Sequence, residues 1–212
     1  MTGMRTRIGI FGGSFDPVHL GHLIMAQDAE EARELDLILF VPAMQPPHKL
    51  SRDLVTADQR ADMLRLALGE RRNWEVSDVE IRRGGVSYSI DTVRHFAQVY
   101  PDAELFFIIG GDTLPELPTW KDIGGLLDCC RIMTMTRPGF APAKLQAAIE
   151  GLPERHRDRL MHDVIPSHAI DISSTDIRMR VAQKRPVGYL VPEAVEHYIR
   201  EHGLYRKEGK TS

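Results

Sequence analysis

The chain of 212 residues contains very little cysteine: only the neighbours Cys129 and Cys130. Adjacent cysteines in an apolar segment cannot link distant parts of a fold. We therefore expect buried, reduced thiols in a cytoplasmic protein, and no disulfide framework, redox pair or metal site. The sequence also lacks an apolar run of ~18 residues, so we expect no membrane-spanning helix. Residues 1–7 carry no apolar stretch, so we expect no secretory signal.

A strong excess of charge is also missing. The 27 Lys and Arg residues nearly balance the 30 Asp and Glu residues, which gives a formal net charge of −3. Bulk charge of this kind does not favour a nucleic-acid partner, so an anion site must be built locally. With 42% hydrophobic and 27% charged residues, the composition is that of an ordinary globular protein. We expect one domain over residues 1–206 and a disordered tail over 207–212.

Apolar runs alternate with helical patterns along the chain, and this alternation is typical of an α/β protein with a mostly parallel, doubly wound, Rossmann-like sheet. The run 105–109 is apolar throughout, which favours a strand covered on both faces. The basic segment 155–159 is interpreted as a solvated helix face or loop. We expect strands at 7–11, 37–41, 74–79, 105–109, 131–136 and 162–165, and helices at 20–35, 57–68, 90–99, 120–127, 174–182 and 193–202.

The most informative segment is a glycine-rich turn that follows the first strand and precedes a helix. Its first residues are Gly12, Gly13, Ser14 and Phe15. A strand, such a turn and a helix N-terminus form an anion site, since backbone N–H groups and the helix dipole face the ligand. His19 and His22 are three residues apart and share a face of the first helical turn, where both can donate to phosphate oxygens. Gly21 leaves room for a ligand to approach the backbone.

Two common phosphate-binding motifs do not fit this turn. The dinucleotide fingerprint requires glycine where Ser14 and Pro17 stand, and an acidic residue after the second strand, which instead ends at Pro42. The only Gly-Lys-Thr lies at 209–211 in the polar tail, and Leu204 stands where a P-loop needs its first glycine.

A second helix N-terminus carries similar chemistry. Ser173 is a plausible N-cap, with Asp176 three residues later as in a capping box. Ser174, Thr175 and Arg178 add hydroxyls and a guanidinium that can bind phosphate. Two such N-termini without a carboxylate pair favour nucleotidyl transfer, which requires alignment and charge stabilisation more than acid–base chemistry. The sequence contains neither the Gly-x-Ser-x-Gly motif of hydrolases nor a zinc-ligand spacing.

Seven motifs in a fixed order resemble those of bacterial nicotinate-nucleotide adenylyltransferases, which belong to the nucleotidyltransferase superfamily. The resemblance extends from about residue 7 to 205. The motifs are His19-x-Gly-His22, Pro46-Pro47-His48-Lys49, Ser87-Tyr88-Ser89-Ile90-Asp91-Thr92, Gly110-Gly111-Asp112 with Leu117 and Trp120, Arg137-Pro138-Gly139, Ile172-Ser173-Ser174-Thr175-Asp176-Ile177-Arg178, and Pro192-x-x-Val195-x-x-Tyr198-Ile199.

The resemblance implies a role for each matching residue. Trp120 would stack on the pyridine ring of the mononucleotide, and backbone amides near Ser89 would receive its carboxylate. Asp112 would lie between the two nucleotides. The implied catalytic residues are His19, His22, Lys49 and Arg178. The implied ATP-binding residues are Gly12, Gly13, Ser14, Phe15, Gly110, Asp112, Arg137, Ser173, Ser174 and Thr175. The implied mononucleotide-binding residues are Tyr88, Ser89, Asp91, Thr92 and Trp120.

The resemblance further implies the reaction: AMP passes from ATP to nicotinate mononucleotide, giving nicotinate adenine dinucleotide and pyrophosphate in NAD biosynthesis. Mg²⁺ would be bound mainly by phosphates and water, with no protein ligand. Two alternatives stay open. One is a different transferase of the superfamily, such as a phosphopantetheine adenylyltransferase, although those chains are typically shorter and lack the Pro-Pro-His-Lys and Arg-Pro-Gly elements. The other is a nucleotide-binding sensor that has lost catalysis. The sequence leaves the oligomeric state open.

Overall fold

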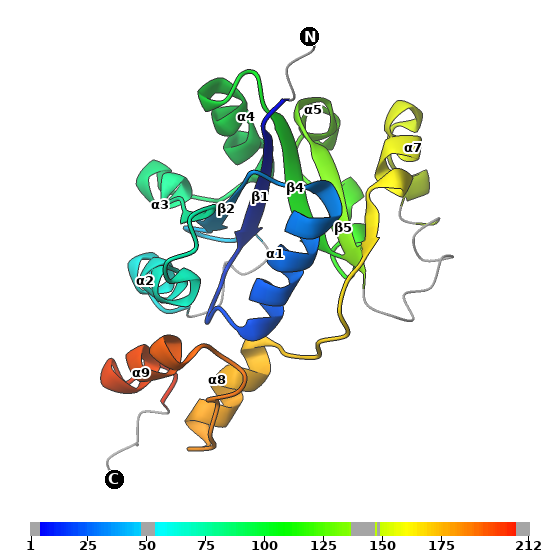
Figure 1. Cartoon of the computed structure of the whole chain (residues 1–212). Helices are drawn as coiled ribbons and strands as arrows, with labels where there is room; N and C mark the ends of the chain where they lie inside the picture. The colour runs from blue at the N-terminus through cyan, green and yellow to red at the C-terminus, as the bar shows by residue number, and fades with distance from the viewer. Residues whose placement is uncertain (1–4, 48–53, 137–146, 148, 207–212) are drawn as a thin grey trace.

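The computed structural model describes residues 5–47, 54–136, 147 and 149–206, and its centre is a six-stranded sheet (Figure 1). The strand order is β3-β2-β1-β4-β5-β6, and all five strand pairings are parallel. The strands are β1 (Arg7–Gly13), β2 (Leu37–Pro42), β3 (Trp74–Val76), β4 (Glu104–Gly110), β5 (Arg131–Thr136) and β6 (Val164–Pro166). This confirms the predicted doubly wound α/β fold. The order reverses between β1 and β4, the point at which such sheets bind ligands.

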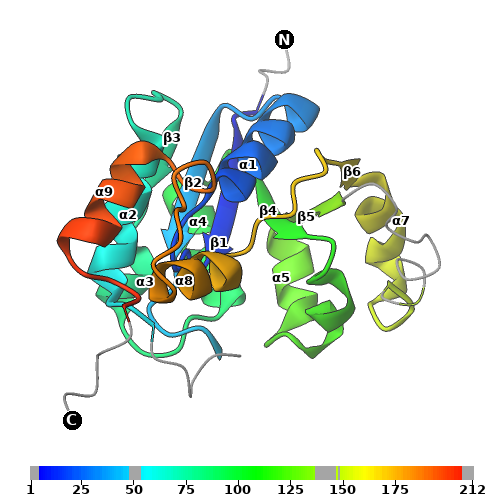
Figure 2. The same cartoon turned by 90° about the horizontal axis from the view of Figure 1, so that it is seen from below.

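Helices cover both faces of this sheet (Figures 1 and 2). One face packs against α1 (Leu20–Arg33), α2 (Ala57–Leu68), α8 (Ser174–Ala182) and α9 (Glu193–Glu201). The other packs against α3 (Val79–Arg83), α4 (Ser89–Val99), the 3₁₀ helix η2 (Leu114–Thr119), α5 (Ile123–Cys129) and α7 (Glu154–His162). None of the helices in the described ranges combines the length and apolar character that crossing a membrane requires.

The strands are continuous apolar runs because both of their faces are buried. Successive side chains of a strand point to opposite faces. In β4, Phe106 and Ile108 therefore belong to the core cluster beneath α1, while Leu105, Phe107 and Ile109 belong to the cluster on the opposite face. The prediction that this run is covered on both faces is confirmed.

Several boundaries differ from the sequence prediction at short elements. The strand expected at 74–79 ends at Val76, and α3 begins three residues later. The helix expected at 120–127 covers 123–129, because Asp122 accepts a hydrogen bond from Gly125 N and sets the start of α5. Helices α3, η2 and α7 were not predicted individually. With nine residues or fewer each, they are too short for a clear helical period.

The basic segment 155–159 lies within α7, and its arginines mainly hold that helix in place. Arg155 donates to Asp128 at 3.0 Å. Arg159 donates to Leu127 O, and to Cys130 O at 3.0 Å. Cys129 and Cys130 are both free thiols, and burial raises the pKa of the Cys130 thiol. Cys130 is buried, as predicted, and its backbone carbonyl binds Arg159 of α7, whereas Cys129 is only partly buried.

A buried carboxylate joins α1 to the second half of the sheet. The Asp163 side chain is fully buried and accepts hydrogen bonds from Arg33 Nε at 3.0 Å and from Arg131 Nε at 2.7 Å. Burial raises the pKa of the Asp163 carboxyl, but the hydrogen bonds from Arg131 and Arg33 outweigh it, and the pKa lies below its ordinary value. The carboxylate is thus more stable when folded than in the unfolded chain.

Replacing Asp163 with asparagine tests this link. At pH 7 we expect Asp163→Asn to lower the free energy of unfolding by about 3–5 kcal/mol, because two partly buried guanidinium groups lose their counter-charge. A group with a lowered folded pKa stabilises above its unfolded pKa of about 3.9 and loses that effect as the pH falls through the folded pKa. The gap between wild type and variant should therefore shrink below about pH 4.

Urea unfolding at pH 7 and at pH 3.5 measures this gap. Asp158→Asn changes an exposed carboxylate on α7, the helix that ends just before Asp163. This variant serves as the control and should leave stability nearly unchanged. Equal stability of Asp163→Asn and wild type at pH 7 would contradict the proposed role of the Asp163 carboxylate. A difference in unfolding free energy that widens as the pH falls would contradict it as well.

Candidate active site

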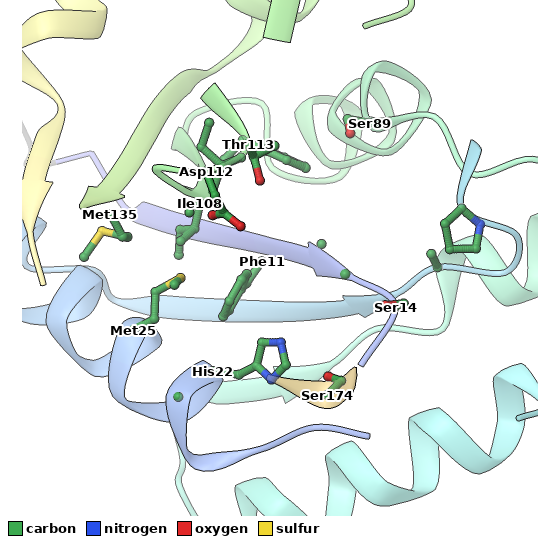
Figure 3. A pocket seen from close by; sticks show the side chains of 18 of the residues that line it. Phe11, Ser14, His22, Met25, Ser89, Ile108, Asp112, Thr113, Met135 and Ser174 are labelled. Carbon is green, nitrogen blue, oxygen red and sulfur yellow. The ribbon is translucent and has the colours of Figure 1, made fainter. Parts of the chain in front are cut away.

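A cavity of ≈ 660 Å³ lies at the carboxyl ends of the central strands, where the strand order reverses. The end of β1 and the start of α1 form one wall, and the N-terminal turn of α8 lies beside them (Figure 3). The other walls come from the end of β4, the N-terminus of α4 and the segment around Trp120. Elements distant in sequence therefore contribute to one binding site.

The glycine-rich turn leads directly into α1, as predicted. Helix α1 begins at Leu20, and His19 is its N-cap residue in an extended conformation. His19 N donates to His22 Nδ1 at 3.2 Å, and the two imidazole rings stack with centroids 3.7 Å apart. Because Nδ1 of His22 accepts this bond, the proton of the neutral ring lies on Nε2. His22 therefore carries its N–H donor at Nε2, on a ring that the backbone N–H of His19 orients.

Small and aromatic residues shape this turn. A Cβ at Gly21 would lie 3.1 Å from His19 Nδ1, so the glycine also makes room for the His19 ring. Phe15 is buried and packs its ring 5.1 Å from that of His22. Phe15 adopts a φ of 46°, a left-handed conformation that is costly for a large side chain and persists only where packing enforces it. It supports the turn from beneath and does not line the cavity.

The N-terminus of α8 is bonded directly to the same turn. Ser173 caps the helix by accepting from Asp176 N at 3.1 Å, as the sequence predicts. Ser174 Oγ donates to Pro17 O at 2.9 Å. One arm of Arg178 donates to Asp16 O, and the other donates to Thr175 Oγ1 at 2.9 Å. Two helix N-termini, each the positive end of a helix dipole, thereby face one cavity.

Two residues that sequence reasoning missed hold this arrangement from behind. Arg60 on α2 is 1% exposed and donates to Ser14 O at 2.8 Å, to Val55 O at 3.1 Å and to Met44 O at 3.2 Å. Burial lowers the pKa of this guanidinium, although arginine keeps its proton in proteins. A signal was present in the sequence, since Arg60 interrupts the apolar face of its helix, and a charge on such a face must have partners.

The second residue is Tyr205, near the end of the described chain. Its hydroxyl donates to the buried Asp16 carboxylate at 2.8 Å, and burial raises the pKa of the tyrosine. The bond joins positions 189 residues apart. No sequence pattern predicts this pairing.

The other end of the cavity is aromatic. Trp120 packs edge-on against Phe107, with ring centroids 5.9 Å apart. Tyr88 is the N-cap residue of α4, so Ser89 occupies the first helical position. Lys121 Nζ lies 4.2 Å from the centroid of the Tyr88 ring and 3.2 Å from Asp91 Oδ2. An indole face and a helix N-terminus thus lie side by side, which suits a flat ring that carries an anionic group.

Two residues predicted for this end of the site do not line the cavity. Thr92 is buried and donates to Glu80, and Asp91 pairs with Lys121. Burial raises the pKa of Glu80 above its ordinary value, although hydrogen bonds with Ser87 and Thr92 act against it. These contacts hold the start of α4 in position.

Most of the other predicted site residues meet in this one cavity. Lys49 and Arg137 lie outside the described residues. The predicted residues that line the cavity are Gly12, Gly13, Ser14, His19, His22, Tyr88, Ser89, Gly110, Asp112, Trp120, Ser173, Ser174, Thr175 and Arg178. In the described part of the chain, no three His, Cys, Asp or Glu side chains are grouped so that they could hold a metal ion.

Comparison with known proteins agrees with this geometry. Residues 10–180 match the cytidylyltransferase-like family. A relative from Moorella thermoacetica, named probable nicotinate-nucleotide adenylyltransferase, is 45% identical over 201 residues, covering 94% of this chain and 92% of its own. A relative of the same name from Opitutus terrae is 45% identical over 200 residues, covering 94% of this chain and 98% of its own.

A solved structure has the same fold. It is the nicotinic acid mononucleotide adenylyltransferase of Plasmodium falciparum complexed with NaAD, which superposes with a TM-score of 0.73 at 16% identity and covers 95% of this chain and 98% of its own. The sequence relatives and the family match together place the chain: it belongs to the cytidylyltransferase-like family and, within it, to the nicotinate-nucleotide adenylyltransferases.

Proposed function

We propose that the protein transfers AMP from ATP to nicotinate mononucleotide, producing nicotinate adenine dinucleotide and pyrophosphate for NAD biosynthesis. The observation that carries this proposal is the convergence of two helix N-termini and an aromatic platform in one cavity. The first two features suit a triphosphate, and the third suits a pyridine ring. The names of the sequence relatives support the same reaction.

The chemistry is a direct displacement at the α-phosphorus of ATP. A phosphate oxygen of the mononucleotide forms a bond to that phosphorus, and the bond from it to the oxygen bridging the β-phosphorus breaks. Pyrophosphate leaves with the electron pair. The residues proposed to stabilise this charge are His19, His22, Lys49 and Arg178, together with the amides of the turn and of α8. Gly110, Asp112 and Arg137 are proposed to contact ATP.

Mg²⁺ is the proposed cofactor. In the described part of the cavity wall, the permanently charged cations are Lys121 and Arg178, and both already face a carboxylate: Lys121 pairs with Asp91 and Arg178 with Asp16. A triphosphate brings about four negative charges, so a divalent cation fits the remaining imbalance. Mg²⁺ would be held mainly by phosphate oxygens and water, and it would supply charge neutralisation on the leaving pyrophosphate.

The cellular setting follows from the same proposal. The partners are ATP and nicotinate mononucleotide, and we propose that residues 1–206 act as one domain in the cytoplasm. Free thiols at Cys129 and Cys130 are consistent with a reducing compartment.

Acceptor choice tests the proposed function. With ATP saturating, pyrophosphate release is measured with nicotinate mononucleotide, its amide and phosphopantetheine. We expect the acid to be preferred over the amide by at least about tenfold in kcat/KM. The reason is that backbone N–H groups at Ser89 bind a carboxylate by charge-assisted hydrogen bonds, whereas an amide directs N–H donors at them. Equal kcat/KM for acid and amide would indicate dual specificity, and turnover with phosphopantetheine alone would refute the proposal.

Trp120→Ala tests the aromatic platform. Loss of stacking should raise KM for the mononucleotide by roughly 5- to 150-fold, which corresponds to the ~1–3 kcal/mol typical of base–aromatic stacking. KM for ATP should change little. Tyr189→Ala removes an aromatic side chain that is 97% exposed and lies outside the cavity wall, and should alter neither constant. An equal rise in both KM values, or a loss of thermal stability alone, would show that Trp120 only packs in the core.

A further inference from the structure

A histidine that no sequence motif includes lines the cavity. His168 lies two residues after the end of β6, and its side chain is 72% exposed and lines the cavity. It is fixed by Asp28, a buried carboxylate on α1. Asp28 accepts from Ser167 Oγ at 2.6 Å, from His168 N at 2.8 Å and from His168 Nδ1 at 2.7 Å. One buried side chain therefore holds both the backbone and the ring of His168.

The state of Asp28 determines what His168 offers a ligand. Burial raises the pKa of the Asp28 carboxyl, but the hydrogen bonds from Ser167 and His168 outweigh it, and the pKa is lowered. A charged carboxylate can only accept hydrogen bonds, so Nδ1 of His168 carries the proton and donates in the bond to Asp28. The neutral ring then carries a lone pair on Nε2. No hydrogen bond to Nε2 is found among the described residues. His168 thus presents an oriented acceptor at the cavity wall.

The position of His168 indicates which part of a ligand it meets. Under the proposed function, the turn and α8 take the triphosphate, and Trp120 takes the pyridine ring. The remaining wall carries Met25 and Met135, which lie together at one end of the cavity in Figure 3, and Ile170. Apolar side chains of this kind suit the faces of a flat heterocycle. The base of ATP is the part of the substrates left for this space.

We propose that His168 selects adenine by accepting a hydrogen bond through Nε2 from the 6-amino group, with Asp28 as its positioning residue. The inference rests on the proposed use of ATP. The 6-amino group is the only exocyclic donor of adenine. Hypoxanthine and guanine carry a carbonyl oxygen at that position. Two acceptors would then face each other, and a site built to accept a hydrogen bond rejects a base that cannot donate it.

Equilibrium binding tests this proposal with a double-mutant-style cycle, in which both the side chain at position 168 and the 6-amino group of the nucleotide are removed. Kd is measured by calorimetry for wild type and His168→Ala with ATP and with purine riboside triphosphate, which has hydrogen in place of the amino group. Wild type should bind ATP about tenfold more tightly than the purine analogue. In His168→Ala this ratio should fall to about one to two, because the partner of the amino group is gone. His202→Ala, which changes a histidine outside the cavity wall, should retain the wild-type ratio.

Further measurements distinguish a loss of base selection from a general loss of nucleotide binding. Inosine triphosphate should be rejected by wild type and bound by His168→Ala nearly as well as ATP. Asp28→Asn should reduce the ATP preference in the same direction, since the ring loses its charged partner. KM for the mononucleotide should stay unchanged in His168→Ala. An unchanged ATP preference in His168→Ala, or equal weakening of all three nucleotides, would overturn the proposal. If wild type binds ATP selectively but releases no pyrophosphate, the proposed reaction fails while base selection stands.

Discussion

The site depends on the bond between the glycine-rich turn and the N-terminus of α8. Ser174 donates to Pro17 O, and Arg178 donates to Asp16 O, across 157 and 162 residues of sequence. A single helix N-terminus offers a few N–H groups and about half a unit of positive charge. Fixing two of them against one turn produces a surface that can hold several phosphate oxygens at once. These two hydrogen bonds therefore set the direction in which the N-terminus of α8 faces the cavity.

Other segments hold that connection in place. Arg60 binds three carbonyl oxygens behind the turn, and Tyr205 binds the Asp16 carboxylate. Buried charged groups are costly unless fully paired, and removing one partner leaves the other uncompensated. The main effect of Arg60, Tyr205 and Asp16 is therefore to fix the geometry of the turn, and their net contribution to the free energy of unfolding is smaller. A rigid turn matters because transfer between two phosphates depends on alignment, and small displacements of the reacting atoms are costly in rate.

Much of this architecture could be predicted from sequence because local signals agreed with the tertiary structure. The strand–turn–helix order around 12–15, the cap at Ser173 and the burial of the run 105–109 on both faces each follow from a local signal, and the structure confirms these three structural predictions. Short helices such as α7 escaped prediction because tertiary hydrogen bonds from Arg155 and Arg159 hold them. The pairing of Asp28 with His168 joins positions 140 residues apart, and no local spacing encodes such a contact.

The most direct test of the shared triphosphate site is the catalytic effect of Arg178→Lys, with Arg180→Lys on the same helix as control. Lysine keeps the charge but cannot bond the turn and Thr175 while also reaching phosphate oxygens, since it lacks the planar fork. Arg180 donates to Pro186 O and lies outside the cavity wall. We expect Arg178→Lys to lower kcat/KM for ATP by a factor on the order of 10², as for loss of one preorganised donor, with little change in melting temperature. Wild-type kcat/KM in a folded Arg178→Lys variant would contradict the account.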